Sequence, residues 1–315
     1  PRGPGWMLTA MAHGWNVIVK KESLEAKDGN LREMDNHPGT GPFKYVSRND
    51  EVWVQERFDD YWDPSKPNVN RIEHIWLVAW TPELSAALLS GVVDWGMWLD
   101  PKLGNDIRDG KKDGLKGLRW TLPNVGGMVF NTLRTPYDDK RVRKAISIAV
   151  DNAAIIEATK DLRESALGDW FLFGTPFAMT PDELAATPGL RAPTDADIEM
   201  AQALLADAGY PNGDGFPTVT LVTRETPDQK IANAAIQAML KQHLNIDAVI
   251  ELADVSVHGE KLRAQEFDFS TNAGYTVGLT DPAAYIVAGL GTCGDRPCDQ
   301  NFGQWKNADF DDLIG

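Results

Sequence analysis

Cysteine is scarce in this chain of 315 residues, which contains only Cys293 and Cys298. They lie five positions apart in G-T-C-G-D-R-P-C-D-Q, where Gly and Pro predict a loop that could bring the two sulfurs within bridging distance. We predict a small disulfide, which would indicate an oxidising compartment. The alternatives are two free thiols or half of a metal site, but a metal site would need further ligands and the five histidines are scattered.

Basic charge is also low, because 31 Lys and Arg residues face 46 Asp and Glu residues, for a net charge of −15. Such a field repels phosphate backbones and anionic membranes, so nucleic acid is not expected as a partner. No apolar run reaches the roughly 18 residues that cross a bilayer. Residues Pro1 to Gly5 lack the basic and then apolar layout of a signal peptide. The sequence therefore predicts a soluble chain with no readable export signal.

Arrangements typical of catalysis are missing as well. The neighbouring carboxylates Asp59-Asp60 and Asp311-Asp312 suit an extended segment and a helix start better than acid–base chemistry. The pair Gly39-x-Gly41 precedes Pro42 and a strand, so it lacks the helix N-terminus of a phosphate site. We predict no catalytic residue, no metal site and no cofactor.

The first part of the chain has mixed α/β patterning. Alternating apolar residues around Asn49-Asp50 predict a hairpin. Thr81-Pro82-Glu83 is a helix start with a capping hydroxyl, and Gly91 ends that helix. The expected strands are 44–47, 52–58, 72–78 and 92–95.

Tryptophan is concentrated in this first part, with six residues between positions 53 and 98. We expect most of them, including Trp53, Trp62 and Trp76, to pack structurally. Trp98 differs, because with Gly96 and Met97 it follows the strand expected to end near Trp95. A rigid aromatic side chain at the carboxyl end of a strand is where α/β folds place ligand contacts.

The second part reads as an α/β domain. A strand ends at Asn131, and an amphipathic helix begins at Asp139. A second helix runs from Asp195 to Ala208, with Gly209 as its left-handed cap. The clearest unit is a strand, a long helix and a strand, which together predict a parallel βαβ crossover over 218–223, 227–243 and 246–252.

Several segments resemble the extracytoplasmic solute-binding proteins of the peptide/nickel class, family 5, which feed ABC importers. The most informative is F-N-T-L-R-T-P-Y-D-D-K-R-V-R-K-A-I-S-I-A-V-D, from Phe130 to Asp151. Three further segments resemble other blocks of the family, in the expected order. They are G-T-G-P-F with the later Y-W, then L-L-S-G-V-V-D, and then A-Q-A-L-L-A-D-A-G-Y-P-N-G-D-G. Thr280-Asp281-Pro282 and the stretch from Asn301 continue the likeness over nearly the whole chain.

The resemblance implies a periplasmic-binding-protein-like fold of type II, with two α/β lobes, mixed sheets and a hinge. Residues 1–121 would be part of the first lobe, as its returning segment, and residues 122–315 most of the second. The hinge would lie near 117–127. Family members are usually longer, so we expect a fragment, incomplete at both ends, without the N-terminal subdomain and the final return strands.

By the same resemblance, the segment Gly96, Met97 and Trp98 would line a cleft between the lobes. Peptide-binding members hold the ligand's amino group with an Asp in W-x-x-D-x-x-[DE]-P. In this chain, Tyr275 occupies the motif position of the Trp, and Gly278 occupies that of the Asp. The candidate ligand-binding residues are Met97, Trp98, Asn131, Tyr275, Thr276 and Gly278. For Asn131 the competing role is to end a strand before the Pro136 turn.

The sequence thus predicts a solute-binding component of an ABC importer, not an enzyme. Without the anchoring carboxylate, an oligosaccharide or another neutral solute is favoured over a peptide. An oligopeptide- or dipeptide-binding protein of the same family is the first alternative, and a hydrolase or lyase acting on a small polar substrate is the second. The expected partners are the small solute and a membrane permease. We expect a monomer that is periplasmic or extracellular and membrane-associated.

Overall fold

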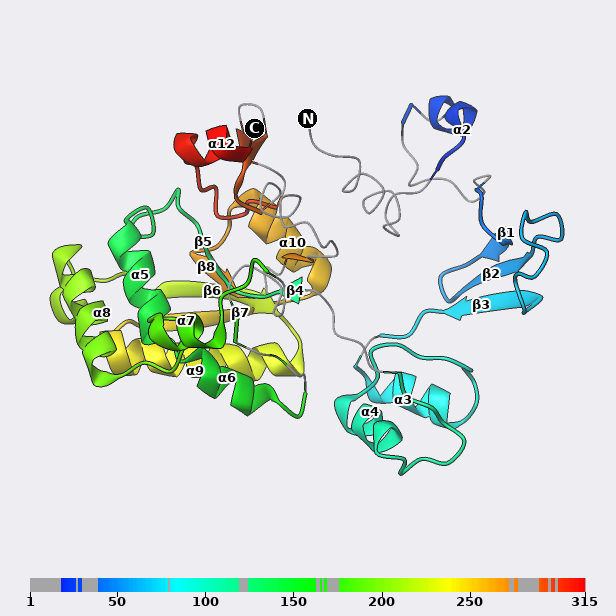
Figure 1. Cartoon of the computed structure of the whole chain (residues 1–315), viewed down its shortest axis with the longest axis horizontal. Helices are drawn as coiled ribbons and strands as arrows, with labels where there is room; N and C mark the ends of the chain where they lie inside the picture. Colours follow the sequence, from blue (N-terminus) through cyan, green and yellow to red (C-terminus); the bar gives the residue numbers. More distant parts are fainter. Residues whose placement is uncertain are drawn as a thin grey trace. The chain divides into compact units, whose positions relative to one another are not determined.

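The chain divides into two units, residues 1–118 and residues 119–315, and each is described by itself (Figure 1). The computed structural model describes residues 18–26, 28–29, 39–78, 80–118, 124–162, 165, 167–168, 176–271, 275–276, 289–293, 296–297 and 300–314. The division falls within the stretch 117–127 in which the sequence places the hinge. That this stretch acts as a hinge stays a prediction.

A three-stranded antiparallel sheet forms the first part of unit 1, in the order β1-β2-β3. Its strands are β1 (Phe43–Arg48), β2 (Val52–Arg57) and β3 (Arg71–Ile75). The turn between β1 and β2 is held by the Asn49 side chain, whose Oδ1 accepts hydrogen bonds from the backbone N–H groups of Glu51 and Val52. This confirms the predicted hairpin. A short helix, α2 (Lys21–Glu25), lies earlier in the same unit.

Two short helices follow, α3 (Pro82–Leu89) and α4 (Pro101–Arg108). Thr81 caps α3 through the Leu84 N–H, as the sequence predicts. The expected strand over 92–95 is wrong, because the N–H groups of Val92 and Val93 both turn back to the carbonyl oxygen of Ala87. The strand expected over 72–78 is shorter, because β3 ends at Ile75, whose partner Val52 begins β2.

Unit 2 is built on a four-stranded mixed sheet in the order β5-β8-β6-β7. Its strands are β5 (Met128–Phe130), β6 (Val219–Arg224), β7 (Ala248–Ala253) and β8 (Phe269–Thr271). β8 pairs antiparallel with β5 and parallel with β6, and β6 pairs parallel with β7. Further short pairs join β4 (Asn124–Val125) to β9 (Tyr275–Thr276) and β10 (Thr292–Cys293) to β11 (Arg296–Pro297).

Helices begin where the sequence offers capping side chains. Asp139 caps α5, and Thr194 forms a capping box with Asp197 at the start of α8. The predicted helices and the βαβ unit are confirmed, except that β7 begins at Ala248 because Ile246 still donates its N–H to the carbonyl oxygen of Leu240 in α9. The helices described in unit 2 include α5 (Lys140–Ala149), α6 (Asn152–Thr159), α7 (Pro181–Ala186), α8 (Asp195–Asp207), the 3-10 turn η1 (Pro211–Gly213), α9 (Pro227–Leu244), α10 (Val255–Ala264) and α12 (Ala308–Ile314).

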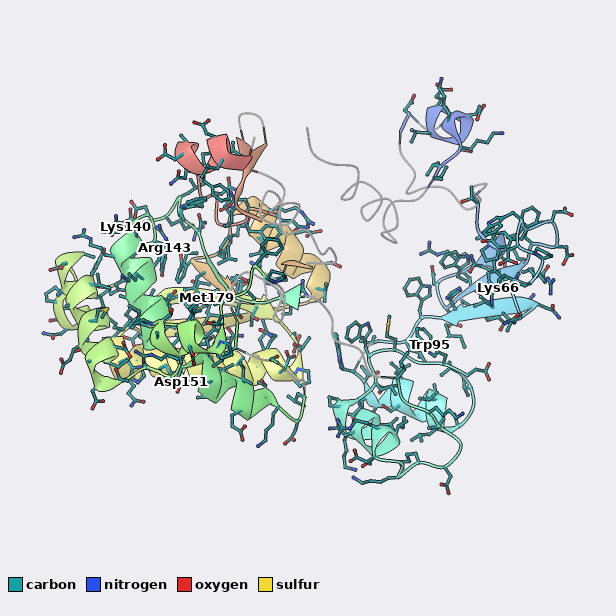
Figure 2. The ribbon with its side chains drawn as sticks, in the orientation of Figure 1. Lys66, Trp95, Lys140, Arg143, Asp151 and Met179 are labelled. Carbon is teal, nitrogen blue, oxygen red and sulfur yellow. The ribbon has the colours of Figure 1, made fainter. Side chains whose placement is uncertain are left out.

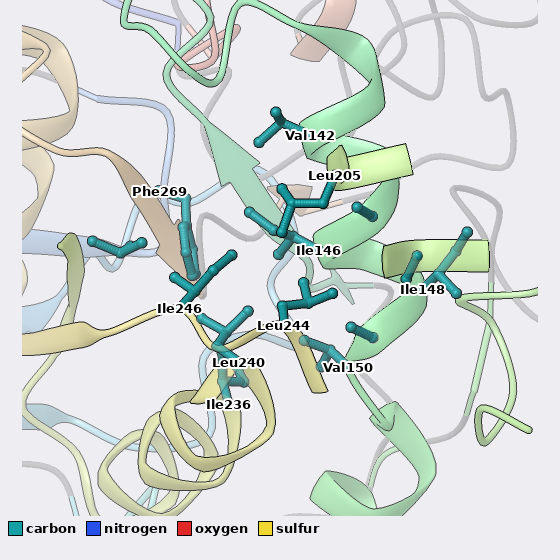
Figure 3. Close-up of a cluster of buried hydrophobic side chains, with 14 of the residues drawn as sticks. Val142, Ile146, Ile148, Val150, Leu205, Ile236, Leu240, Leu244, Ile246 and Phe269 are labelled. Carbon is teal, nitrogen blue, oxygen red and sulfur yellow. The ribbon is translucent and has the colours of Figure 1, made fainter. Parts of the chain in front are cut away.

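Apolar side chains cover both faces of the four-stranded sheet. On one face, Leu221 and Phe269 pack with side chains of α5, α8 and α9 in the larger core, part of which Figure 3 shows. On the other face, Val222 packs with Leu262 of α10 and with Phe267. The sheet is therefore the middle layer of an α/β unit. No helix in the described part of the chain is long and apolar enough to cross a membrane.

His258 of α10 is buried against the second face of this sheet. Its Nε2 lies 3.0 Å from Ser270 Oγ of β8, and among the described residues its Nδ1 has no hydrogen-bond partner. Burial, and secondly the positive charge of Arg224, lower the pKa of His258 from 6.5 to about 4. The neutral imidazole is therefore the form that fits the folded protein.

We predict that unit 2 loses stability as the pH falls from about 6.5 to about 4. The unfolded chain binds a proton at His258 in this range and the folded chain does not, so protonation favours unfolding. A shift of this size corresponds to roughly 3 kcal/mol of unfolding free energy at most. Urea unfolding at a series of pH values measures the slope.

The variant His258→Gln is the comparison, because it removes the titrating group and keeps a polar side chain. Its unfolding free energy should change less between pH 6.5 and pH 4 than that of the wild type. An NMR titration that gives His258 a pKa near 6.5 in the folded protein would contradict the prediction.

Candidate functional site

Met97 and Trp98 lie in the connection between α3 and α4 of unit 1. Trp98 has a φ of 61°, and its carbonyl oxygen accepts a hydrogen bond of 2.7 Å from the N–H of Trp80, which itself has a φ of 62°. The two indole rings lie 5.5 Å apart at an angle of 48°. Backbone strain of this kind persists only where surrounding contacts stabilise it. The hydrogen bond and the ring contact provide such stabilisation, so Trp80 and Trp98 form one fixed aromatic pair.

The aromatic pair is accessible to solvent. Trp98 is 39% exposed, and Met97 is exposed to the same extent. Because 92–95 is a turn, Trp98 does not follow a strand, and the strand-end argument for its role no longer holds. The prediction that Trp98 contacts the ligand now rests on the family resemblance and on its exposed ring, which is held by Trp80.

Other tryptophans of unit 1 are exposed as well, which corrects the expectation that most are packed. Trp62 is 79% exposed and Trp76 60%, whereas Trp53 is half-buried and stacks on His74. Trp95, which Figure 2 labels in unit 1, is 71% exposed. Monomeric proteins rarely leave many aromatic rings in water, so this unit presents an unusual amount of surface for contacts.

The candidate segment of unit 2 begins at Tyr275. Tyr275 and Thr276 form β9, where Tyr275 pairs with Val125 and Thr276 with Asn124 of β4. Only their backbone belongs to the described structure, and Gly278 lies outside the described residues. These three residues stay predictions as ligand contacts.

Asn131 has a structural position in the interior of unit 2. It is fully buried, its Nδ2 donates to the carbonyl oxygens of Gln265 and Phe267, and its Oδ1 accepts from the N–H of Leu133. The amide therefore ties the end of β5 to the chain before β8. These bonds match the competing role of Asn131 at the end of a strand, and its role as a ligand contact stays a prediction.

The predicted disulfide falls on a hairpin. Cys293 of β10 pairs with Arg296 of β11, so the backbone reverses between the two cysteines. Cys298 and the side chain of Cys293 lie outside the described residues. The disulfide stays a prediction.

Sequence reasoning missed a cluster of buried polar side chains at the carboxyl ends of β6 and β8. Its members are Thr223 of β6, Gln229 and Asn233 of α9, and Thr271 of β8. A signal was present, because Gln229 and Asn233 stand four residues apart on the stripe of α9 that continues with buried Ile236 and Leu240. Polar residues on an apolar stripe indicate a buried hydrogen-bonding role.

The shifted pKa values of the described residues have structural causes. Hydrogen bonds from Arg191 and Thr194 lower the pKa of Asp197 to about 2, as suits a helix cap. Burial raises the pKa of Tyr137. No group of three or more metal-binding side chains occurs in the ranges that the structure covers. Both pKa shifts are therefore explained by the capping and packing of unit 2.

Relatives among curated proteins are binding proteins. The chain is 23% identical over 98% of its length to the oligopeptide-binding protein OppA of Bacillus subtilis, of which it covers 55%. It is 27% identical over 91% of its length to the heme-binding protein A of Haemophilus influenzae, of which it covers 50%. The chain thus spans about half the length of these relatives.

Solved structures show the same fold. The binding protein AgaA from A. tumefaciens R10, in complex with agropinic acid, matches with a TM-score of 0.77 and 26% identity, over 98% of this chain and 59% of the AgaA chain. The murein tripeptide-binding protein MppA of Escherichia coli matches with a TM-score of 0.74 and 20% identity. The α/β fold is thus that of periplasmic binding proteins. Residues 2–295 match the bacterial extracellular solute-binding proteins, family 5 (Middle), and the chain belongs to this family.

Proposed function

We propose that the intact protein is the solute-binding component of an ABC importer. The observation that carries this proposal is the family match over residues 2–295. The named relatives bind oligopeptides, dipeptides, heme or glutathione, and none of these names describes an enzyme. No observation on the described residues favours the hydrolase or lyase alternative.

The proposed mechanism uses two lobes that close on the solute and hand it to a membrane permease. Residues 1–121 would belong to the first lobe and 122–315 to the second, with a hinge near 117–127. The division of the chain at residue 118 supports this arrangement. Ligand that bridges two lobes stabilises the closed state only through contacts that the open state lacks. A periplasmic or extracellular location beside the permease, and a monomeric state, belong to the same proposal.

The proposed solute carries no free amino group at its anchoring end. By the family resemblance, Gly278 stands at the position of the carboxylate that anchors peptides, and glycine has no side chain to pair with an ammonium group. Burying an unpaired charge costs several kcal/mol, so an ammonium would bind poorly there. The relative in complex with agropinic acid supports a solute other than a simple peptide. An oligosaccharide or another neutral solute fits best.

The proposed contacts come from both units. Met97 and Trp98 would form an apolar wall, on which the faces of sugar rings or other flat groups can stack. Tyr275, Thr276 and Gly278 would offer backbone groups and, at Tyr275, a second aromatic ring. Neutral polar ligands are held by such walls with a few well-placed hydrogen bonds.

We predict that blocking the amino group of a peptide does not weaken its binding. Trialanine, N-acetyl-trialanine and maltotriose are compared in a thermal-shift assay of the intact protein, since a ligand of the folded state raises the melting temperature. N-acetyl-trialanine or maltotriose should raise it at least as much as trialanine. A rise with trialanine alone would show that the protein has an ammonium anchor.

The variant Gly278→Asp is the matched control for this assay. It should shift the preference toward trialanine, because the new carboxylate can pair with the ammonium group.

We also predict that Trp98→Ala weakens binding of the neutral probe by about tenfold, the size of one lost aromatic contact. Isothermal titration calorimetry gives the dissociation constants. Trp95→Ala is the control, because it removes the same side chain three residues earlier from a more exposed position. Equal losses in both variants would contradict a specific role for Trp98.

A further inference from the structure

The last residue of β8 is held by buried hydrogen bonds from both sides of the sheet. All three residues of this strand are buried, and Thr271, at its carboxyl end, is only 7% exposed. Thr271 faces α9 together with Thr223 of β6, and Ser270 faces α10 together with Val222. Polar residues stand here although the preceding Phe269 is part of the apolar core.

On the first side, Thr271 is bonded through its hydroxyl group. Thr271 Oγ1 donates to Asn233 Oδ1 over 2.9 Å. Asn233 Nδ2 in turn donates to Thr223 Oγ1 over 3.1 Å and to the carbonyl oxygen of Gln229 over 2.8 Å. Thr223 Oγ1 donates to Gln229 Oε1 over 3.2 Å. With these donors and acceptors, the hydroxyl protons of Thr223 and Thr271 and both amide protons of Asn233 all have acceptors.

On the second side, Thr271 is bonded through its backbone. Ser270 Oγ donates to the carbonyl oxygen of Thr271 over 3.1 Å, so it must accept from His258 Nε2, which lies 3.0 Å away. His258 therefore carries its proton on Nε2. Thr271 is thus linked to two helices, directly to α9 through its side chain and to α10 through the bond of its carbonyl oxygen to Ser270.

Holding the strand in the sheet does not require this network. Burying polar groups brings little net stability, and an apolar pair of similar shape can replace a hydrogen-bonded pair at nearly no cost. On the α9 side, where the hydroxyl protons and the Asn233 amide protons all have acceptors, such a network adds a single, rigid arrangement of the groups that it joins. The network is therefore suited to fixing the position of the chain that leaves β8.

That chain leads directly to the proposed ligand-binding segment. Tyr275 follows Thr271 by four positions, so their Cα atoms lie at most about 14 Å apart even if the chain is extended. Tyr275 and Thr276 are then fixed a second time by pairing with β4. Thr271 is the carboxyl-terminal residue of β8, so its hydrogen bonds hold the chain on the sheet side of this segment.

We propose that Thr271, held by Asn233 and by His258 through Ser270, positions the backbone of Tyr275 and Thr276 for ligand binding. This inference rests on the proposed function, because it takes the Tyr275 segment as a ligand contact. Thr271, Asn233 and His258 are positioning residues, since none of them needs to contact the solute.

Hydrogen–deuterium exchange on the intact protein tests the positioning. Thr271→Val removes the hydroxyl group while keeping the shape of the side chain. The backbone amides of Tyr275 and Thr276 should then exchange about tenfold faster, the change expected for the loss of one net hydrogen bond. Thr271→Ser keeps the hydroxyl group and should exchange like the wild type, although its shape differs more.

Two further variants separate positioning from general loss of stability. Ile236→Val shortens a core side chain of the same helix, one turn beyond Asn233, and should leave exchange at Tyr275 and Thr276 unchanged after correction for global stability. The double variant Thr271→Val with Asn233→Leu replaces the hydrogen-bonded pair by two apolar side chains, so no buried polar group of the pair is left unpaired. It should therefore fold even if Thr271→Val alone does not, and its amides at Tyr275 and Thr276 should also exchange faster than in the wild type. If the amides of Tyr275 and Thr276 exchange in Thr271→Val and in the double variant at the same rate as in the wild type, the inference is overturned.

Binding is measured on the same variants with maltotriose and N-acetyl-trialanine as probes. The affinity should fall about tenfold in Thr271→Val and recover in Thr271→Ser. If the amides of Tyr275 and Thr276 exchange faster but the affinity for both probes is unchanged, the link between positioning and binding is overturned. That result would also count against the Tyr275 segment as a ligand contact in the proposed function. Unchanged exchange would overturn the positioning alone and leave the proposed function untouched.

Discussion

The burial of strand β8 is the constraint on which unit 2 depends. This strand has only three residues, yet it pairs with β5 on one edge and with β6 on the other. It thereby joins the segment at 128–130 to the βαβ unit that starts at Val219. Because both faces of β8 are covered, a shift by one residue would turn Phe269 out of the larger core and bring Ser270 into it. This short strand therefore constrains the register of β5 and β6, with which it pairs.

The two units differ in how they use their side chains. Unit 2 contains a buried apolar core and also a buried polar network, whereas unit 1 leaves Trp62, Trp76 and Trp95 exposed. A rigid sheet that ends in a fixed strand can hold a binding segment still, and exposed aromatic rings can supply contact area at low entropic cost. Both properties are consistent with the solute-binding role that we propose for the intact protein.

Local patterns predicted the elements that depend on local physics. The hairpin at Asn49, the capped helix at Thr81 and the βαβ unit were predicted because turn chemistry, capping and periodicity act within a few residues. The strand expected over 92–95 failed, because its amides bond to Ala87 instead of to a partner strand. β8 gave no pattern, since three residues are too few for a period. Asn131 was ambiguous, because only the fold shows that its amide bonds to carbonyls more than 130 positions away.

The central claim is that the solute is held by Trp98 and by the segment that Thr271 anchors. A crystal structure of the intact protein with the tightest-binding of the three probes tests it most directly. The account predicts a solute in contact with the Trp98 ring and with the backbone of residues 275–278, and no ammonium group at position 278. A solute remote from both segments, or a bound peptide whose ammonium group pairs with a carboxylate, would contradict it.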